Sequence, residues 1–472
     1  MVFSSATFLI VFLPAVMALY YLVGVVITKS TAVKNFILLI ASLIFYAWGE
    51  PVYIILMLIS IFFNFVIGKD ISLAKDDENA KRAKTLFIWA VVFNLCVLGF
   101  FKYCDFFVEN LGALFGAEFK PLNLPLPIGI SFYTFQIMSY IIDLYNGKIK
   151  VQKNIFDFAL YVSLFPQLIA GPIVKYKDIE YQLRNRKESL EGYANGLSRF
   201  IIGLSKKLIL ANTLGSVYST VQETGSENIS LLTAWLGIIC YTLQIYFDFS
   251  GYSDMAIGLG SMFGFKFNEN FNHPYVATSV TDFWRRWHIS LSSWFRDYVY
   301  IPLGGNRCKV PRHIFNLMVV WFLTGLWHGA AWNFIFWGVY YGVLLILEKY
   351  VLGRFLEKLP VWSKWLLTFL SVMLGWVFFS APTLREALIY IKAMLGFGSG
   401  IIDSNGMYIL ASNIILILIG ALCATPYYKK LEGMLTDKSA RTIKVLAPSL
   451  LLIICIIFMI SETYNPFLYF RF

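Results

Sequence analysis

The sequence has few charged residues. Asp, Glu, Lys and Arg together make up 14% of its 472 residues, whereas soluble proteins have about 25%. Apolar residue types make up 58%, so there is too little charge to cover a water-facing surface. This composition excludes an ordinary soluble enzyme. It predicts an integral membrane protein, which we interpret as one domain over residues 1–472.

Motifs of several other protein classes are also missing. The six cysteines form no CxxC pair and most lie in apolar runs, so neither a disulfide framework nor a metal site is predicted. No GxxxxGK[ST] phosphate-binding loop occurs. The net charge is +11, but the basic residues lie in short loops between apolar runs. That distribution is typical of membrane topology rather than of nucleic-acid binding.

Long apolar runs recur from one end of the chain to the other. A helix needs about 20 apolar residues to cross the hydrocarbon core of a bilayer. The runs are apolar all round and do not alternate, which favours helices over barrel strands. We predict an all-α membrane protein with about eleven or twelve transmembrane helices. The apolar windows are 7–27, 35–49, 52–68, 86–104, 126–145, 156–174, 193–211, 230–249, 313–327, 332–348, 365–381, 407–425 and 445–461.

Two segments are not expected to cross the membrane fully. Residues 156–174 are interrupted by Pro166, Gly171 and Pro172, which predicts a re-entrant or steeply tilted element surrounded by protein. Residues 282–302 mix charged and aromatic side chains, as interfacial segments do. The distribution of Lys and Arg then predicts that both termini are extracytoplasmic and that the segment 285–312 is cytosolic.

His328 is one of only four histidines and lies between two apolar runs. No Asp, Glu, Lys or Arg occurs within fifteen residues on either side of it. An ionisable residue at such depth is costly and by default marks a functional site. Burial disfavours the charged imidazolium, so a neutral ring that can accept a proton is expected. The structural alternative is a buried histidine that bonds to a neighbouring helix.

His288 lies in a segment that is rich in cations and aromatic residues. Taken alone, it is better explained as an interfacial aromatic residue than as a catalytic one. The cations around it suit either anionic lipid headgroups or a cosubstrate that bears several phosphates, since guanidinium groups pair well with phosphate oxygens. Gly304 and Gly305 allow a tight turn there. The cations are Arg285, Arg286, Arg296, Arg307, Lys309 and Arg312.

Other polar residues have structural interpretations that are favoured over catalysis. Asp248 and Asp254 end an apolar run, where an ion pair with a nearby Arg or a helix cap explains them. His313 is expected to be solvated in the basic loop, and His273, before Pro274, to be a turn or interface residue. The aromatic residues of the C-terminal YNPFLYFRF are explained by an interfacial aromatic belt.

Five stretches resemble the membrane-bound O-acyltransferase family. The similarity is greatest to the branch of bacterial alginate O-acetyltransferases and teichoic-acid D-alanyl transfer proteins, and no departure occurs at the histidines. The stretches are FWRRWHISLSSWFRDYVYIPLGGN, TGLWHGAAWNFIFWG, LFPQLIAGPI, DFSGYSDMAIGLG and the terminal NPFLYFRF.

The resemblance implies a ring of helices around a central tunnel and further short re-entrant or interfacial helices. It implies that His328 is the core catalytic histidine and that His288 is the second one, on the cytosolic side. The donor would be a cytosolic acyl thioester such as acetyl-CoA, whose phosphates would meet Arg285, Arg286, Arg296, Arg307 and Lys309. No permanently bound cofactor is implied.

The same resemblance implies an acyl relay and an exported acceptor. Tyr469, in a short extracytoplasmic tail over residues 462–472, would be a possible relay. An SGNH-type transferase outside the membrane would complete the transfer to a polysaccharide or cell-wall glycan. Two other functions remain open from the residues alone. The first is a glycan or lipid-precursor transporter without covalent chemistry, and the second is a scaffold that recruits a separate transferase.

Overall fold

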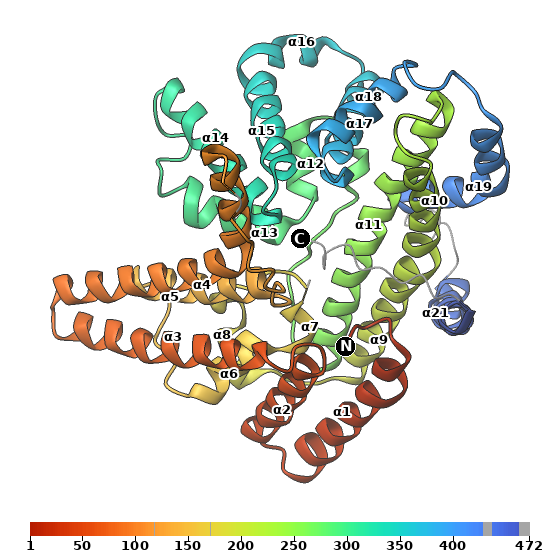
Figure 1. The fold of residues 1–472 in the computed structure, drawn as a ribbon. Coiled ribbons are helices and arrows are strands. Elements are labelled where there is room, and N and C mark those ends of the chain that lie inside the picture. The colour runs from red at the N-terminus through yellow and green to blue at the C-terminus, as the bar shows by residue number, and fades with distance from the viewer. Residues whose placement is uncertain (118, 170, 428–436, 462–472) are drawn as a thin grey trace. The chain divides into compact units, whose positions relative to one another are not determined.

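The fold is known from a computed structural model, which describes all residues except 118, 170, 428–436 and 462–472. Side chains of residues 437–441 are also not described. The described part of the chain contains helices and no strands (Figure 1). The predicted all-α fold is therefore confirmed. The predicted relay residue Tyr469 and the predicted tail lie outside the described residues.

The chain divides into two compact units. Unit 1 contains residues 1–200 and 255–268, and unit 2 contains residues 201–254 and 269–472. Two helices, α9 (Leu190–Ser205) and α11 (Leu231–Met262), pass from one unit into the other. Continuous helices join the two units. The assignment of residues 1–472 to a single domain stays a prediction.

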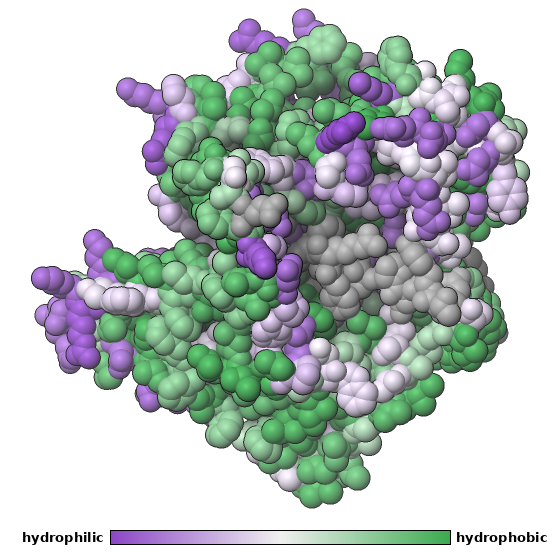
Figure 2. All heavy atoms as spheres, in the orientation of Figure 1, coloured by the Kyte–Doolittle hydropathy of each residue, from purple (hydrophilic) through white to green (hydrophobic). Residues whose placement is uncertain are grey.

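Unit 1 contains four long helices in succession, α2 to α5, which are followed by the short helices α6 to α8. The long helices α3 and α4 form an antiparallel pair that is joined by a polar turn. Figure 2 shows hydrophilic residues gathered at this turn and apolar residues along the helices. The elements are η1 (Thr7–Phe12), α1 (Leu13–Leu19), η2 (Tyr20–Ile27), α2 (Thr31–Gly49), α3 (Tyr53–Asp76), α4 (Ala80–Phe115), α5 (Ile130–Tyr145), α6 (Ile155–Ser163), α7 (Phe165–Leu168) and α8 (Tyr176–Asn185).

Unit 2 contains the helices that follow α9 and is organised around a large aromatic core. The core collects indole, phenol and phenyl rings from α11, α12, α14, α15 and α17. The elements are η3 (Lys206–Ala211), α10 (Asn212–Glu223), η4 (Pro274–Val276), α12 (Val280–Arg286), α13 (Ile289–Phe295), η5 (Arg296–Tyr300), α14 (Val310–His328), α15 (Trp332–Leu347), η6 (Glu348–Leu352), α16 (Gly353–Lys358), α17 (Val361–Ser380), α18 (Leu384–Met394), α19 (Ser404–Cys423) and α21 (Asp437–Ser461).

Ten helical stretches of the described residues are long and apolar enough to cross a membrane. They coincide with ten of the apolar windows predicted above. The prediction of eleven or twelve spans also counted windows 126–145 and 313–327, which form α5 and α14. Helix α5 has 16 residues, nearly all of them buried by neighbouring helices, and α14 begins with Pro, Arg and His in its first turns. The chain is thus a multi-pass membrane protein.

The two segments that were expected not to cross are both broken. Residues 156–174 form the short helices α6 and α7, which are separated at Leu164 and are followed by non-helical backbone. Residues 282–302 form α12, α13 and η5 with a sharp corner at His288. In both cases proline or a polar residue within an apolar run ends the helix before it can span the bilayer.

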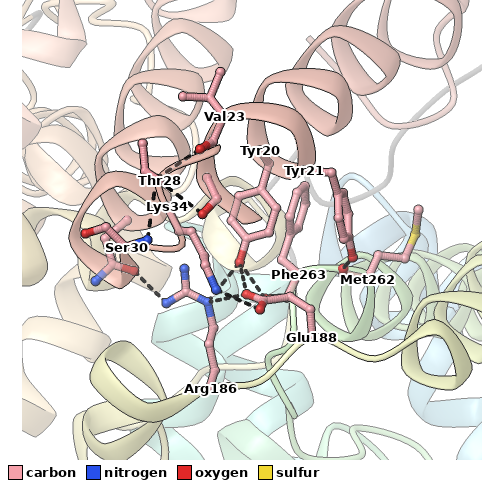
Figure 3. A network of polar contacts seen from close by, with 12 residues as sticks. Tyr20, Tyr21, Val23, Thr28, Ser30, Lys34, Arg186, Glu188, Met262 and Phe263 are labelled. Carbon is pink, nitrogen blue, oxygen red and sulfur yellow. Dashed lines mark hydrogen bonds and ion pairs between the residues drawn. The ribbon is translucent and has the colours of Figure 1, made fainter. Parts of the chain in front are cut away.

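A buried ion network joins the N-terminal helices of unit 1 to the segment after α8. Figure 3 shows the Tyr20 hydroxyl, the Lys34 ammonium and the Arg186 guanidinium around the Glu188 carboxylate. Lys34 Nζ lies 2.7 Å from Glu188 Oε2, and Tyr20 donates to Glu188 Oε1 at 2.6 Å. Arg186 also donates to Asn35 Oδ1 at 2.5 Å. Removal of one member would leave a partner charge buried and unpaired, so we expect the loss of any of these ions to destabilise unit 1.

Candidate active site

His288 lies at the corner between α12 and α13 of unit 2. Ser279 caps α12 by accepting a hydrogen bond from the Asp282 N–H at 3.0 Å. The helix ends beside Trp287, and His288 then adopts a left-handed conformation with φ of 44°. Such a conformation is unfavourable for a residue with a Cβ, so it persists only where neighbouring contacts fix it. Those contacts come from Asn270.

Asn270 is fully buried and holds the His288 corner through its side chain and backbone. Its Oδ1 lies 3.1 Å from His288 Nδ1 and accepts from the Ser290 N–H at 3.2 Å and the Ser290 hydroxyl at 2.9 Å. Its carbonyl accepts from the Ile289 N–H at 3.0 Å, and its Nδ2 donates to Ser253 Oγ at 3.1 Å. One amide thus fixes the backbone and the imidazole together.

The contacts of Asn270 determine the tautomer of His288. A backbone N–H can only donate, so the side-chain atom that faces Ser290 N must be the amide oxygen. That oxygen can only accept, so the facing Nδ1 of His288 carries the proton. The lone pair of the neutral ring is therefore on Nε2. A ring with this tautomer can accept a proton or a hydrogen bond at Nε2.

The His288 ring lies among aromatic side chains and is 1% exposed. Phe249 packs edge-on against it at a centroid distance of 4.6 Å, and Trp327 lies at 5.9 Å. Burial lowers the pKa of His288 well below its usual range, and the neighbouring His328 lowers this pKa further. The ring is therefore neutral at physiological pH.

His328 is the last residue of α14, and its side chain is also buried, at 5% exposure. Trp337 of α15 and Phe379 of α17 lie edge-on to its ring, at centroid distances of 4.9 and 5.2 Å. Helices α14 and α15 approach closely here because Gly325 and Gly338 face each other without side chains. A Cβ on Gly338 would overlap the backbone of α14.

The structure brings His288 and His328 to the same indole ring. Trp327 lies 5.0 Å from His328 and 5.9 Å from His288, measured between ring centroids. The two histidines also interact electrostatically. The two residues that sequence analysis singled out, forty positions apart, therefore form one site with an aromatic lining. The site contains two proton acceptors, and no group of three or more potential metal ligands occurs among the described residues.

The predicted cations lie in two different environments. Arg285, Arg307 and Lys309 are exposed, as residues that meet a phosphate-bearing ligand must be. Arg286 pairs with Asp282 at 2.9 Å, and Arg296 pairs with Asp297 at 3.0 Å. Their role toward a cosubstrate stays a prediction.

Asp248 and Asp254 form ion pairs, as their structural interpretation predicts. The partner of each is a lysine of η3, at 2.6 Å in both pairs, rather than an arginine. The pair of Asp248 with Lys207 is fully buried, at 1% and 3% exposure. These contacts attach α11 to η3.

The expectation for His313 was wrong. It is 3% exposed, and its two ring nitrogens lie 2.6 Å from the hydroxyls of Tyr300 and Tyr350. The sequence suggested solvent because basic residues surround it, whereas Tyr350 comes from a distant helix. His273, by contrast, has a φ of 46° at the turn before Pro274, as a turn residue does.

Sequence analysis also missed Asn270 and Trp327. Asn270 is 18 residues from His288, so nothing in their spacing indicates the contact. The available signal was the polar NFNHPY stretch between two apolar segments. Trp327 directly precedes His328, but its contact with the second histidine depends on how α14 packs in unit 2.

Comparisons with known proteins identify the class. The model of the membrane-bound O-acyltransferase family matches residues 148–385, which include both histidines. The chain is 45% identical to the probable alginate O-acetylase AlgI of Pseudomonas aeruginosa, over 84% of this chain and 76% of that protein. It is 34% identical to the peptidoglycan O-acetyltransferase of Helicobacter pylori, over 100% of this chain and 98% of that protein. It is 30% identical to the teichoic acid D-alanyltransferase of Bacillus subtilis, over 56% of this chain and 71% of that protein.

The chain belongs to the membrane-bound O-acyltransferase family. It is therefore a membrane enzyme that transfers acyl groups, and the branch inferred from the motifs is confirmed. The comparisons give no support to the transporter alternative.

Proposed function

We propose that this enzyme transfers an acetyl group from cytosolic acetyl-CoA to a hydroxyl group of an exported polysaccharide or cell-wall glycan. The observation that carries the proposal is the pair of buried histidines that both pack against Trp327. Two relatives whose names describe O-acetylation of alginate and of peptidoglycan support acetyl as the acyl group and a glycan as the acceptor. The cell membrane is the proposed location, with both termini on the extracytoplasmic side.

The proposed reaction exchanges a thioester for an oxygen ester. His328 takes the proton of the attacking hydroxyl while the hydroxyl oxygen bonds to the thioester carbonyl carbon. The C–S bond then breaks, and the proton returns from His328 to the CoA thiolate, so that the products are an ester and a free thiol. The thioester drives the reaction without ATP. General-base catalysis of this kind contributes roughly 10²–10⁴-fold to the rate.

His288 would orient the thioester on the cytosolic side of the same site. Its Nε2 carries the lone pair because Asn270 holds the proton at Nδ1. Arg285, Arg307 and Lys309 are exposed and would bind CoA phosphates as charge-assisted donors. Arg286 and Arg296 would contribute less, because each already pairs with a carboxylate.

The acetyl group would reach its acceptor through a relay. The first hydroxyl to be acylated is proposed to be that of Tyr469, and an extracytoplasmic SGNH-type transferase would then move the group to the glycan. The C-terminal aromatic sequence that resembles the family's relay supports this step. The relay is separable from the chemistry at the histidines, because a glycan hydroxyl could replace the tyrosine as first acceptor.

The test uses purified protein and acetyl-CoA labelled in the acetyl group. We expect free CoA thiol to appear together with label on the chain or on an added glycan. In the Tyr469→Phe variant, label on the chain should disappear while the binding of acetyl-CoA is unchanged. If folded protein releases no thiol with acetyl-CoA but does so with another acyl thioester, the acetyl proposal is wrong and acyl transfer stands.

A further inference from the structure

Unit 1 contains a group of buried polar atoms that no described residue satisfies. They are the hydroxyls of Tyr46 and Tyr133, both amide atoms of Gln136, and Oε1 of Gln167. The four residues are 2% exposed or less. Folded proteins leave few such atoms without a partner, because each one retains an uncompensated desolvation cost. These five belong to three helices, α2, α5 and α7, and a bound molecule would supply their partners.

Tyr161 contacts both glutamines. Gln167 lies in α7, and its Nε2 donates to the Tyr161 carbonyl at 2.6 Å. The Tyr161 hydroxyl in turn donates to the Gln136 carbonyl at 3.0 Å. Tyr133 lies one turn before Gln136 on α5. The broken segment α6–α7 is thus attached to α5 through Tyr161.

Helix α2 closes the other side of this group. The Phe165 N–H donates to Ser42 Oγ at 3.1 Å, which docks the start of α7 on α2. Tyr46 is one turn beyond Ser42 on that helix. The hydroxyls of Tyr46 and Tyr133 interact electrostatically with each other and with the Glu50 carboxylate. Glu50 follows α2 and is only partly buried. The polar side chains therefore extend from the partly exposed end of α2 to the buried tyrosines.

The surroundings of the group are apolar on the α1 side. Phe165 packs among rings of the N-terminal helices and α2, with centroid distances of 5.5 Å to Phe12 and 5.6 Å to Phe45. Gly129 approaches the Leu168 carbonyl with no room for a Cβ. The residues that carry the polar atoms belong to α2, α5 and α7 and are 2% exposed or less, so lipid does not reach them.

The chemistry of these atoms defines the ligand. The amide of Gln136 offers donors and an acceptor, Gln167 offers an acceptor, and each tyrosine hydroxyl can do both. All five atoms belong to hydroxyl or amide groups, which carry no charge. We propose that this is a binding site for neutral hydroxyl groups, which donate and accept at the same atom. The ligand is ordered water or the hydroxyls of a saccharide.

The bound hydroxyls would hold the broken segment in place on α2 and α5. Buried waters typically make about three hydrogen bonds to polar groups that the protein leaves without partners. This role does not depend on acyl transfer. The saccharide form of the proposal does rest on the proposed glycan acceptor, so the experiment separates the two sources.

The first measurement is thermal stability of the purified protein and its variants. Gln136→Leu and Tyr133→Phe each remove partners of the proposed ligand, and neither breaks a side-chain hydrogen bond to another described residue. If the site is occupied, we expect each to lower Tm by roughly 2–4 °C. Tyr181→Phe, at an exposed tyrosine of the same unit, sets the baseline. If the site is dry, apolar replacements remove the desolvation cost, so an unchanged or raised Tm would overturn the proposal.

The second measurement needs no variant that could misfold. Hydroxyl-radical footprinting of the wild-type protein marks side chains that contact bound water. Tyr133 should be oxidised faster than Tyr140, which is equally buried but already bonds to the Gln152 N–H at 3.2 Å. Protection of Tyr133 by an added oligosaccharide, together with a raised Tm that Gln136→Leu abolishes, would assign the site to saccharide. Equal, slow oxidation of both tyrosines with and without oligosaccharide would contradict the proposal.

Discussion

The clearest consequence of the site concerns Asn270, which never needs to touch the substrate. Asn270→Ala removes the oxygen that holds the Nδ1 proton of His288 and that accepts two further hydrogen bonds from Ser290. One such bond is worth about 1 kcal/mol net, so the two neutral tautomers become similar in energy. The left-handed backbone at the corner also loses a support. We expect kcat to fall by roughly 10- to 100-fold, which corresponds to about 1.4–2.8 kcal/mol.

Asn270→Asp gives a sharper test because it keeps an acceptor and adds a negative charge. A carboxylate beside Nδ1 favours the imidazolium and raises the pKa of His288. The wild-type ring is neutral because burial lowers its pKa well below 6.5, so its rate should be flat from pH 6 to pH 8. The Asp variant should be slow at the lower pH and should recover as the pH rises above the new pKa.

The assay is the initial rate of acetyl-CoA turnover across this pH range. Ser290→Ala is a suitable comparison. It removes a hydroxyl that bonds to Asn270 Oδ1 at 2.9 Å and lies 3.4 Å from His288 Nδ1, but it keeps the contact of Asn270 with His288. The Ala variant should lose much more activity than this comparison. A fully active Asn270→Ala variant, or an Asp variant with the flat profile of the wild type, would refute the tautomer argument.

Three further changes test the packing and the ion pairs. Gly338→Ala should separate α14 from α15 and lower the activity by at least tenfold, measured as kcat. Asp248→Asn leaves Lys207 buried without its partner charge and should cost about 3–5 kcal/mol of stability, measured by chemical unfolding. Although burial alone would raise the pKa of Glu188, its hydrogen bonds, that from Lys34 first, hold it below its usual value of 4.5. The ion network should therefore be fully stabilising above about pH 4.5 and weaken as the pH falls through the lowered pKa, seen as a falling Tm that Glu188→Gln no longer shows.

The membrane spans could be predicted because a run of about 20 apolar residues indicates a transmembrane helix by its length and composition alone. Helices α5 and α14 were harder, since α5 is buried by protein rather than by lipid and α14 carries polar residues in its first turns. The break in residues 156–174 was predictable from its prolines and glycine. The sequence did not predict which polar atoms of this segment would face α5, because their positions depend on contacts between helices that are distant in the sequence.

The two candidate histidines were recognisable for two different reasons. His328 stood out by its isolation from every charged residue, whereas His288 required the surrounding motif. Their meeting at Trp327 and the position of Asn270 are tertiary contacts, which no local pattern encodes. The same limit explains the error at His313, whose partner Tyr350 is 37 residues away.

The central claim is that His328 performs the acyl transfer, and one comparison tests it most directly. Rates of thiol release from acetyl-CoA should be measured for the wild type, His328→Asn and His313→Asn, each shown to be folded by its elution as a single species. His313 is the matched control, because it is as deeply buried but bonds to two tyrosines outside the site. We expect His328→Asn to lose roughly 10²–10⁴-fold in rate, and His313→Asn to stay within a few-fold of the wild type. A folded His328→Asn variant with the wild-type rate would contradict the account.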